Sequence, residues 1–206
     1  MTADEPYAEL PPRPDPETGT PAPPEAPVQF SQGYNEKNAR LPSPPPGKGP
    51  TLAVYRQKRL VSWASGFIPV AVLVVTAILY DGFKVLTLWP VWAILAAAYA
   101  WTVFIMRINT VSAGADWVRG GRKHWVNTYE LARIHIRTYG SNQPGLFLAD
   151  RERTVEIPLG VLQHDRKVWD YVYLGLRHSA ANGARLNLNA RATFPEIAEA
   201  ARDANS

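Results

Sequence analysis

The run LVSWASGFIPVAVLVVTAILY, which occupies Leu60–Tyr80, contains no charged residue. A helix of this length rises about 30 Å, which matches the hydrocarbon thickness of a lipid bilayer. A second uncharged run, VLTLWPVWAILAAAYAWTVFIM, follows at Val85–Met106, and only Asp81–Lys84 separate the two. The sequence therefore predicts transmembrane helices at 60–80 and 85–106 that form a hairpin. The alternative, a hairpin buried inside a soluble protein, is disfavoured by two charge-free runs of this length.

Basic residues are distributed unevenly around this predicted hairpin. Lys84 is the one basic residue between the two runs. The flanking sequences carry Arg40, Lys48, Arg56, Lys58 and Arg59 before the first run, and Arg107, Arg119, Arg122 and Lys123 after the second. Because Lys and Arg are enriched in cytoplasmic loops, this pattern predicts a multi-pass protein of the cell (inner) membrane with both termini in the cytoplasm. Neither run contains an ionisable residue, which argues against an ion or proton path.

The N-terminal region, residues 1–50, is rich in proline. It holds fourteen of the 19 prolines of the chain and almost no aliphatic cluster. Such a composition cannot bury enough apolar surface to offset the entropy of ordering, so we expect a disordered, proline-rich cytoplasmic tether. The spacings from Pro11 to Pro14 and from Pro21 to Pro24 fit a polyproline II ligand as well. Both interpretations, a plain tether and a ligand, stay open.

Short alternating runs follow the hairpin and predict a β-rich domain over residues 109–189. Apolar residues alternate from Val111 to Trp117, a turn follows at Gly120–Gly121, and Trp125 resumes the pattern, which indicates a β-hairpin. Three further strands are expected, at Arg133–Tyr139, Leu146–Ala149 and Val155–Leu159, with turns between them. Strands joined by short turns form an antiparallel meander.

A helix over about residues 165–182 is expected to cover this sheet. Asp165 can cap its first turn, and Gly183 can end it. An apolar stripe at helical spacing is formed by Val168, Trp169, Val172, Tyr173 and Leu176. Trp169 is therefore predicted to be a core residue and not part of a ligand site. In the tail, residues 190–206, Thr193 and Glu196 stand in capping-box spacing and suggest a short helix from Pro195 to Asp203.

The order of these elements resembles a family of bacterial membrane proteins. Two transmembrane helices, the run GLFLADRERTVEIPLGVL at Gly145–Leu162 and the helix DRKVWDYVYLGLRHSAANG at Asp165–Gly183 are similar to small actinobacterial-type membrane proteins of unknown function with a pleckstrin-homology-like domain. The resemblance covers Leu60 to Asn189. It implies a small, antiparallel, bent sheet closed by one amphipathic helix, so the expected fold class is a membrane α-helical hairpin plus an α+β domain.

No catalytic, cofactor-binding or metal-binding motif is present in the sequence. The chain has no cysteine, which excludes thiolate chemistry, and its four histidines do not stand at metal-ligand spacing. Nucleophile elbows, phosphate-binding glycine loops and dinucleotide fingerprints are also missing. A net charge of +4 with scattered basic residues is mild for nucleic-acid binding. We therefore expect no enzyme, no cofactor and no nucleic-acid partner.

These observations predict a non-enzymatic integral membrane protein that presents a pleckstrin-homology-like interaction module at the cytoplasmic face, as an adaptor or scaffold. The alternative is an oligomeric accessory subunit of a membrane transfer or export apparatus. The expected partners are the lipid bilayer and a protein. Arg119, Arg122 and Lys123, at the tip of the first β-hairpin, are candidates for contact with anionic lipid headgroups. The other interpretation of this tip is a solvated turn.

Overall fold

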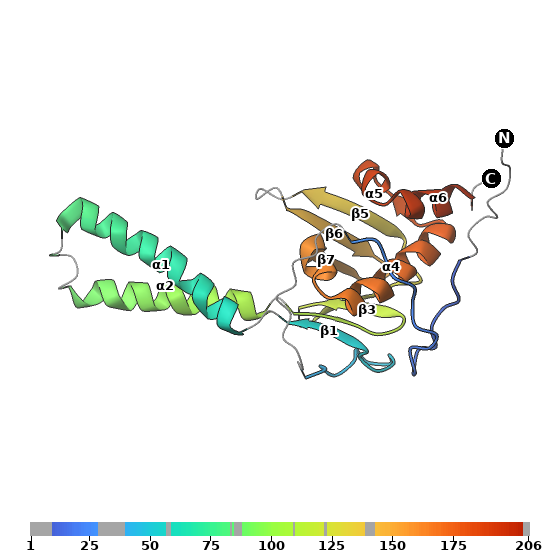
Figure 1. Ribbon diagram of the computed structural model, residues 1–206, viewed down its shortest axis with the longest axis horizontal. Helices are drawn as coiled ribbons and strands as arrows, with labels where there is room; N and C mark the ends of the chain where they lie inside the picture. Colours follow the sequence, from blue (N-terminus) through green and yellow to red (C-terminus); the bar gives the residue numbers. More distant parts are fainter. Residues whose placement is uncertain are drawn as a thin grey trace. The chain divides into compact units, whose positions relative to one another are not determined.

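The structure is a computed structural model and describes residues 10–28, 40–56, 59–82, 84, 88–108, 110–121, 123–138 and 143–203. It separates into two compact units, which are both drawn in Figure 1. The hairpin unit contains Arg56–Thr110. The sheet unit combines most of the N-terminal region, up to Tyr55, with the chain from Val111 onward.

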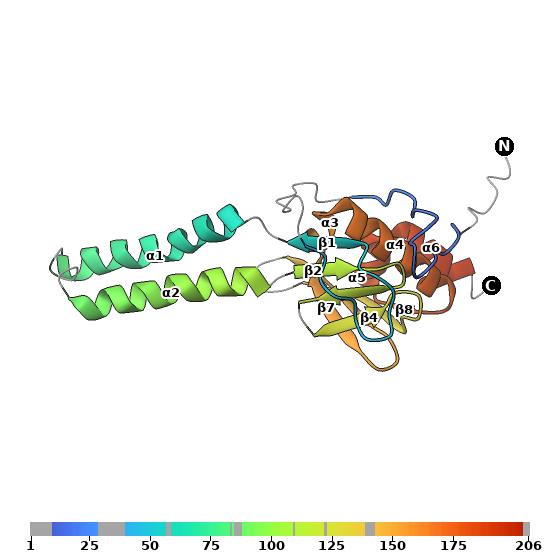
Figure 2. The same ribbon diagram turned by 90° about the horizontal axis from the view of Figure 1, so that it is seen from below.

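The hairpin unit consists of two helices, α1 (Arg59–Asp81) and α2 (Trp89–Ile108), that run side by side (Figures 1 and 2). The rings of Phe67 and Tyr99 contact each other across the pair, with centroids 5.1 Å apart. Leu95 of α2 is buried. Many other large apolar side chains of the two helices are exposed, among them Ile68, Leu79, Trp92, Trp101 and Phe104.

Across the part of the chain that the structure describes, no helix combines the length and the apolar character needed to cross a bilayer. This finding corrects the predicted transmembrane spans at 60–80 and 85–106, the membrane hairpin in the fold class, and the multi-pass location in the inner membrane. α2 begins at Trp89 and not at Val85. Both helices also include charged residues near their ends, Arg59 and Asp81 in α1 and Arg107 in α2.

The first sheet has the strand order β1-β2-β3-β4. Its strands are β1 (Ala53–Arg56), β2 (Thr110–Ala113), β3 (Trp117–Gly120) and β4 (His124–Asn127). The single strand expected at Val111–Trp117 is in fact two strands, β2 and β3, which pair antiparallel. A turn at Gly114 reverses the chain, and a Cβ on Gly114 would lie 2.2 Å from Trp117 Nε1. The alternating pattern therefore correctly predicted β structure on both sides of Gly114. It did not show the turn between β2 and β3, where a side chain larger than that of glycine would collide with Trp117.

The second sheet has the strand order β7-β6-β5-β8. Its strands are β5 (Arg133–Thr138), β6 (Pro144–Ala149), β7 (Thr154–Pro158) and β8 (Arg185–Leu186). The first three form the antiparallel meander that the alternating pattern predicts. The short β8 adds to the edge of β5 in parallel.

The segment between β4 and β5 packs closely against a helix of the sheet unit. The helix is α4 (Arg166–Ala181). Ser179 Oγ of α4 donates to the Thr128 carbonyl at 2.7 Å and accepts from the Leu131 N–H at 3.1 Å. A Cβ on Gly175 would lie only 2.5 Å from Thr128 Cβ, so the helix backbone approaches this segment closely. The α+β class is therefore right, whereas a single bent, pleckstrin-homology-like sheet closed by one helix is wrong.

Four helices belong to the sheet unit. Besides α4 they are α3 (Leu159–Gln163), α5 (Leu188–Thr193) and α6 (Pro195–Asp203). Asp165 caps α4 as predicted, because its side chain accepts from the Val168 N–H at 2.9 Å. Gly183 follows α4 with a φ of 89°. α6 occupies the residues at which the sequence suggested a short helix, Pro195–Asp203. Thr193 belongs to α5, and its hydroxyl donates to the Asn189 carbonyl.

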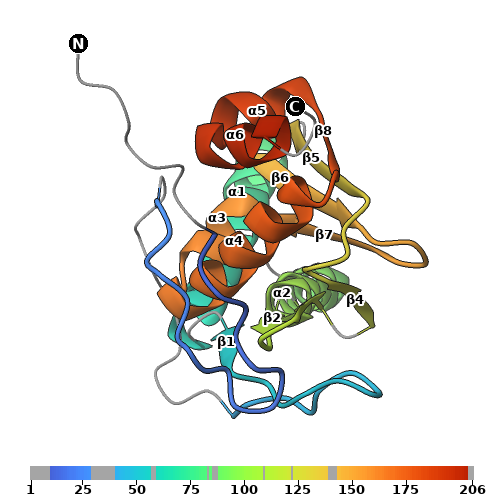
Figure 3. The same cartoon turned by 90° about the vertical axis from the view of Figure 1, so that its right-hand side faces the viewer.

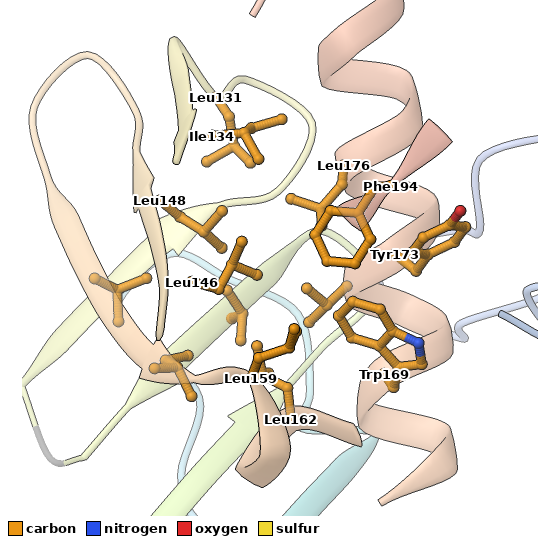
Figure 4. Packing of buried hydrophobic residues seen from close by; sticks show 14 of the residues in the cluster. Leu131, Ile134, Leu146, Leu148, Leu159, Leu162, Trp169, Tyr173, Leu176 and Phe194 are labelled. Atoms are coloured by element: carbon orange, nitrogen blue, oxygen red, sulfur yellow. The ribbon is translucent and has the colours of Figure 1, made fainter. Parts of the chain in front are cut away.

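The core of the sheet unit lies between α4 and the two sheets (Figure 4). Trp169 is 0% exposed, which confirms its prediction as a core residue. Its ring packs against Tyr173, with centroids 5.4 Å apart, and against Phe194, at 5.7 Å. Strand and helix residues complete the cluster, among them Ile134, Leu146, Leu148, Leu159, Leu162 and Leu176.

Candidate peptide-binding site

Residues 10–28, which we call the strap, belong to the sheet unit and pass beside α4 (Figures 1 and 3). The sequence had indicated a disordered tether here. Instead, Asp15 organises a local turn, because its side chain accepts from the N–H groups of Glu17 and Thr18. The N–H groups of Thr18 and Glu17 stabilise the carboxylate and lower the pKa of Asp15. Gly19 closes the turn with a φ of 69°.

The strap is bound to α4 mainly through its backbone. Three ring side chains of α4 each meet one strap carbonyl: Trp169 Nε1 donates to Pro27 O at 2.8 Å, Tyr171 OH donates to Gly19 O at 3.1 Å, and His178 Nε2 lies 2.8 Å from Pro11 O. A carbonyl oxygen can only accept, so Nε2 of His178 carries the proton. These contacts extend along the helix from its first turns to its last turn. The strap is therefore held at both of its ends and near its middle.

Ala26 of the strap is 3% exposed and belongs to the core cluster. Its N–H donates to Asp170 Oδ1 at 2.9 Å. Asp170 also accepts from Arg166, which in turn forms an ion pair with Glu25 of the strap at 3.0 Å. Burial raises the pKa of Asp170, while the Ala26 N–H and Arg166 oppose this effect. Three consecutive strap residues therefore each contact one side chain of α4. Glu25 pairs with Arg166, the Ala26 N–H donates to Asp170, and the Pro27 carbonyl accepts from Trp169.

A second proline-rich stretch, residues 40–52, contacts the first sheet. Lys48 forms an ion pair with Asp116 at 2.6 Å. Trp117 Nε1 donates to the Gly49 carbonyl at 3.2 Å, and Arg119 Nη2 donates to the Ser43 carbonyl at 2.9 Å. A buried tryptophan indole therefore bonds to a proline-rich backbone at two places in the sheet unit.

His178 gives the end of the strap a dependence on pH. Burial lowers the pKa of His178, Arg13 and Arg177 add to this effect, and the hydrogen bond to Pro11 opposes it. The ring also packs on Tyr129, with centroids 5.2 Å apart. Because the strap covers the imidazole, the closed state binds a proton less readily than the open state. Acid therefore favours release of the strap end.

We expect the amide chemical shifts at Leu10–Arg13 to move towards free-chain values as the pH falls from about 6.5, the ordinary pKa of histidine, to about 5. In His178→Gln the side-chain amide can still donate to Pro11 O but does not titrate, so these shifts should stay constant over the same range. His164→Gln serves as a control that keeps the dependence. A dependence that persists in His178→Gln would contradict this assignment.

The predicted headgroup residues lie elsewhere in the sheet unit. Arg119, in β3, is half-buried: it donates to Ser112 Oγ and Ser43 O, and lies over the Trp117 ring. Lys123 is exposed in the turn between β3 and β4, and Arg122 is outside the described residues. Arg119 is thus bound to the stretch 40–52. Contact of Arg119, Arg122 and Lys123 with lipid headgroups stays a prediction. Among the described residues, no group of three or more His, Asp or Glu side chains is arranged for a metal ion.

The ring donors at Trp169, Tyr171 and His178 were missed as a site. The stripe of α4 indicated only a core position for Trp169. Its indole N–H lies at the surface of that core and faces the strap (Figure 4). One signal in the sequence could have revealed the site. A buried tryptophan needs an acceptor for its N–H, and the proline-rich segment of the same chain offers backbone carbonyls. Comparison of the chain with models of protein families, with curated proteins and with solved structures gives no match, so the strap-binding face of α4 is the observation on which a function can be proposed.

Proposed function

We propose that the chain is a non-enzymatic interaction module, an adaptor or scaffold, whose α4 face binds extended proline-rich peptide. The strap is the resident occupant of this face. The observation that carries the proposal is the set of three donors on α4, Trp169, Tyr171 and His178, that meet three backbone carbonyls of the strap.

Proline-rich segments suit such a face for two physical reasons. Polyproline II backbone has no internal hydrogen bonds, so its carbonyls are free to accept from a protein surface. Proline also restricts the unbound peptide, which reduces the entropy lost on binding. Aromatic rings with one polar edge, such as indole and phenol, offer both apolar contact and a donor. The α4 face combines these features with the buried contact at Ala26.

The charged groups of the face define the peptide that fits best. Arg166 is placed for an acidic residue, and Asp170 accepts from the N–H of a small buried residue one position later. A proline cannot replace that small residue, because it has no N–H to donate. The next residue supplies the carbonyl for Trp169. We therefore infer a preference for the order acidic, small, proline, which the strap presents at Glu25–Ala26–Pro27.

A test uses the full chain with its strap weakened at one position. Ala26→Asp places a second carboxylate beside Asp170 in a buried site, so it should release the strap and leave the α4 face accessible. A labelled peptide of residues 10–28 should then bind the Ala26→Asp chain at least about tenfold more tightly than the wild-type chain, a difference of about 1.4 kcal/mol. In the wild-type chain the tethered strap competes at high effective concentration.

Ala22 provides the matched control, since it is exposed in the same strap. The Ala22→Asp chain should bind the peptide as weakly as wild type does. The peptide with Ala26→Asp should not bind the released chain, whereas the peptide with Ala22→Asp should. Hydrogen exchange in β5 and β6 shows that the sheet unit of each variant is folded. Equal peptide binding by all three folded chains, or none by any of them, is incompatible with the proposal.

A further inference from the structure

The strap also contributes to a hollow at the end of α4. The hollow has a volume of about 870 Å³, within the range of small-molecule sites. Its lining includes Arg13 of the strap, Arg133, Arg151 and Arg185, together with Glu130 as the one acidic residue. A neighbouring hollow of about 560 Å³ shares Gly183, Ala184 and Arg185 with it and adds Arg191 and Arg202, with no acidic residue.

The guanidinium groups of the larger hollow are not neutralised within the described residues. The salt bridges found there involve Lys48, Arg153 and Arg166, and none involves the four arginines of the hollow. Arg13 lies over the ring of Tyr129, 5.0 Å from its centroid, and Arg133 lies 5.9 Å from that of Phe147. Stacking of this kind holds a guanidinium in place while its N–H groups stay available.

Tyr129 forms part of the wall of the hollow. The residue is 7% exposed and lines the hollow, and its hydroxyl is buried without a hydrogen-bond partner among the described residues. Burial raises the pKa of Tyr129, so the hydroxyl keeps its proton and can donate. Asp116 and Tyr171, which do not line the hollow, are among the groups that shift this pKa, so Tyr129 contributes to the hollow mainly through the ring that lies under Arg13.

The nearby end of α4 does not oppose an anion as a free helix C-terminus would. Carbonyls at a helix C-terminus carry partial negative charge. Here the carbonyls of His178, Ser179 and Ala180 accept from the N–H groups of Asn182, Ala184 and Gly183, at 2.9–3.0 Å. The charge at the hollow is therefore dominated by the arginines.

We propose that this hollow binds a small molecule with at least two adjacent phosphates, held between Arg13 of the strap and Arg133, Arg151 and Arg185 of the sheet unit, and that the bound anion keeps the strap closed. Guanidinium groups bind phosphate oxygens in a bidentate manner, and a diphosphate offers enough oxygens for several of them. Because Arg13 belongs to the strap, the anion stabilises the closed state by mass action. This regulation rests on the function proposed above, whereas anion binding by the sheet unit does not.

Inorganic pyrophosphate is the probe, titrated by calorimetry into the full chain at fixed ionic strength. We expect saturable binding that orthophosphate and sulfate do not match at the same concentration. Arg13→Gln and Arg185→Gln should each weaken it about tenfold. Lys167→Gln, which removes one exposed positive charge from the first turn of α4 outside the hollow, should leave it unchanged. Equal affinity for pyrophosphate and ATP would assign recognition to the phosphates alone, and tighter binding of ATP would add a nucleoside contact; both support the site.

The effect on the strap is measured by hydrogen exchange at residues 10–28. Pyrophosphate should slow this exchange in the wild-type chain and not in Arg13→Gln. Loss of pyrophosphate binding in Arg185→Gln but not in Arg13→Gln would overturn the proposal, since the strap would then lie outside the site. Equal binding by wild type, Arg185→Gln and Lys167→Gln would overturn it too. The peptide experiment with Ala26→Asp uses no anion, so its failure is distinguishable from failure here.

Discussion

Replacing Trp169 with alanine is expected to lower the free energy of unfolding of the sheet unit by about 3–5 kcal/mol, the usual cost of removing a fully buried large aromatic ring. Trp169 is 0% exposed, and it packs on Tyr173 and Phe194. The substitution leaves a cavity between α4 and α6, and it also removes the donor to Pro27 O. Denaturant unfolding followed by circular dichroism measures the loss.

Trp169→Phe separates these two contributions. Phenylalanine keeps much of the ring contact but has no N–H, so the strap loses its bond at Pro27 while most of the core remains. We expect a smaller loss of stability than in Trp169→Ala, together with faster hydrogen exchange near Ala26 and Pro27. Leu188→Ala is the control for an apolar residue that is largely exposed, and it should change stability by less than about 0.5 kcal/mol. An Ala variant that unfolds like the parent chain would show that Trp169 is not a core residue.

The sequence predicted those features that depend on neighbouring residues. The stripe of α4, its cap at Asp165 and its end at Gly183 all follow from side-chain spacing over a few turns. The strands β5, β6 and β7 follow from alternation over five or six residues. In each case the pattern is repeated within the element, and the partner along the sheet is the next element of the chain.

Features that join distant segments could not be predicted in this way. β1 precedes the hairpin unit in the chain but joins the sheet that follows it, and β8 adds two residues to β5 from beyond α4. The strap contacts α4 across more than 140 residues of sequence. A proline-rich composition describes the cost of ordering a free chain, and it contains no information about a surface that offsets that cost.

The candidate site was hidden for the same reason. The sequence offered two interpretations of the prolines, a tether and a ligand, but it did not show that the binding surface lies in the same chain. Hydrogen bonds to backbone carbonyls need no particular strap side chain, so the strap has no motif that reveals them. The predicted membrane spans were wrong as well: the absence of charge marks an apolar run but does not determine where a helix begins, and α2 begins later than its run does.

Gly175 allows α4 to approach the segment after β4 closely, and it leads to the last prediction. A Cβ at this position would lie 2.5 Å from Thr128 Cβ and 3.0 Å from the Thr128 carbonyl oxygen. Gly175→Ala must therefore displace the segment whose carbonyl accepts from Ser179. We expect a loss of about 1–3 kcal/mol in the free energy of unfolding, although alanine favours helix more than glycine does.

Gly160→Ala is the matched control, because it makes the same change in another helix of the sheet unit. The nearest atom to a Cβ on Gly160 is His164 Cε1 at 3.9 Å, so there is room for the methyl group. Here only the helix preference acts, and stability should rise by up to about 1 kcal/mol. Opposite signs for the two variants would show that close approach of α4 to Thr128, and not helix preference, requires glycine at 175. If both variants gain stability, the close approach of α4 to Thr128 does not require glycine at 175.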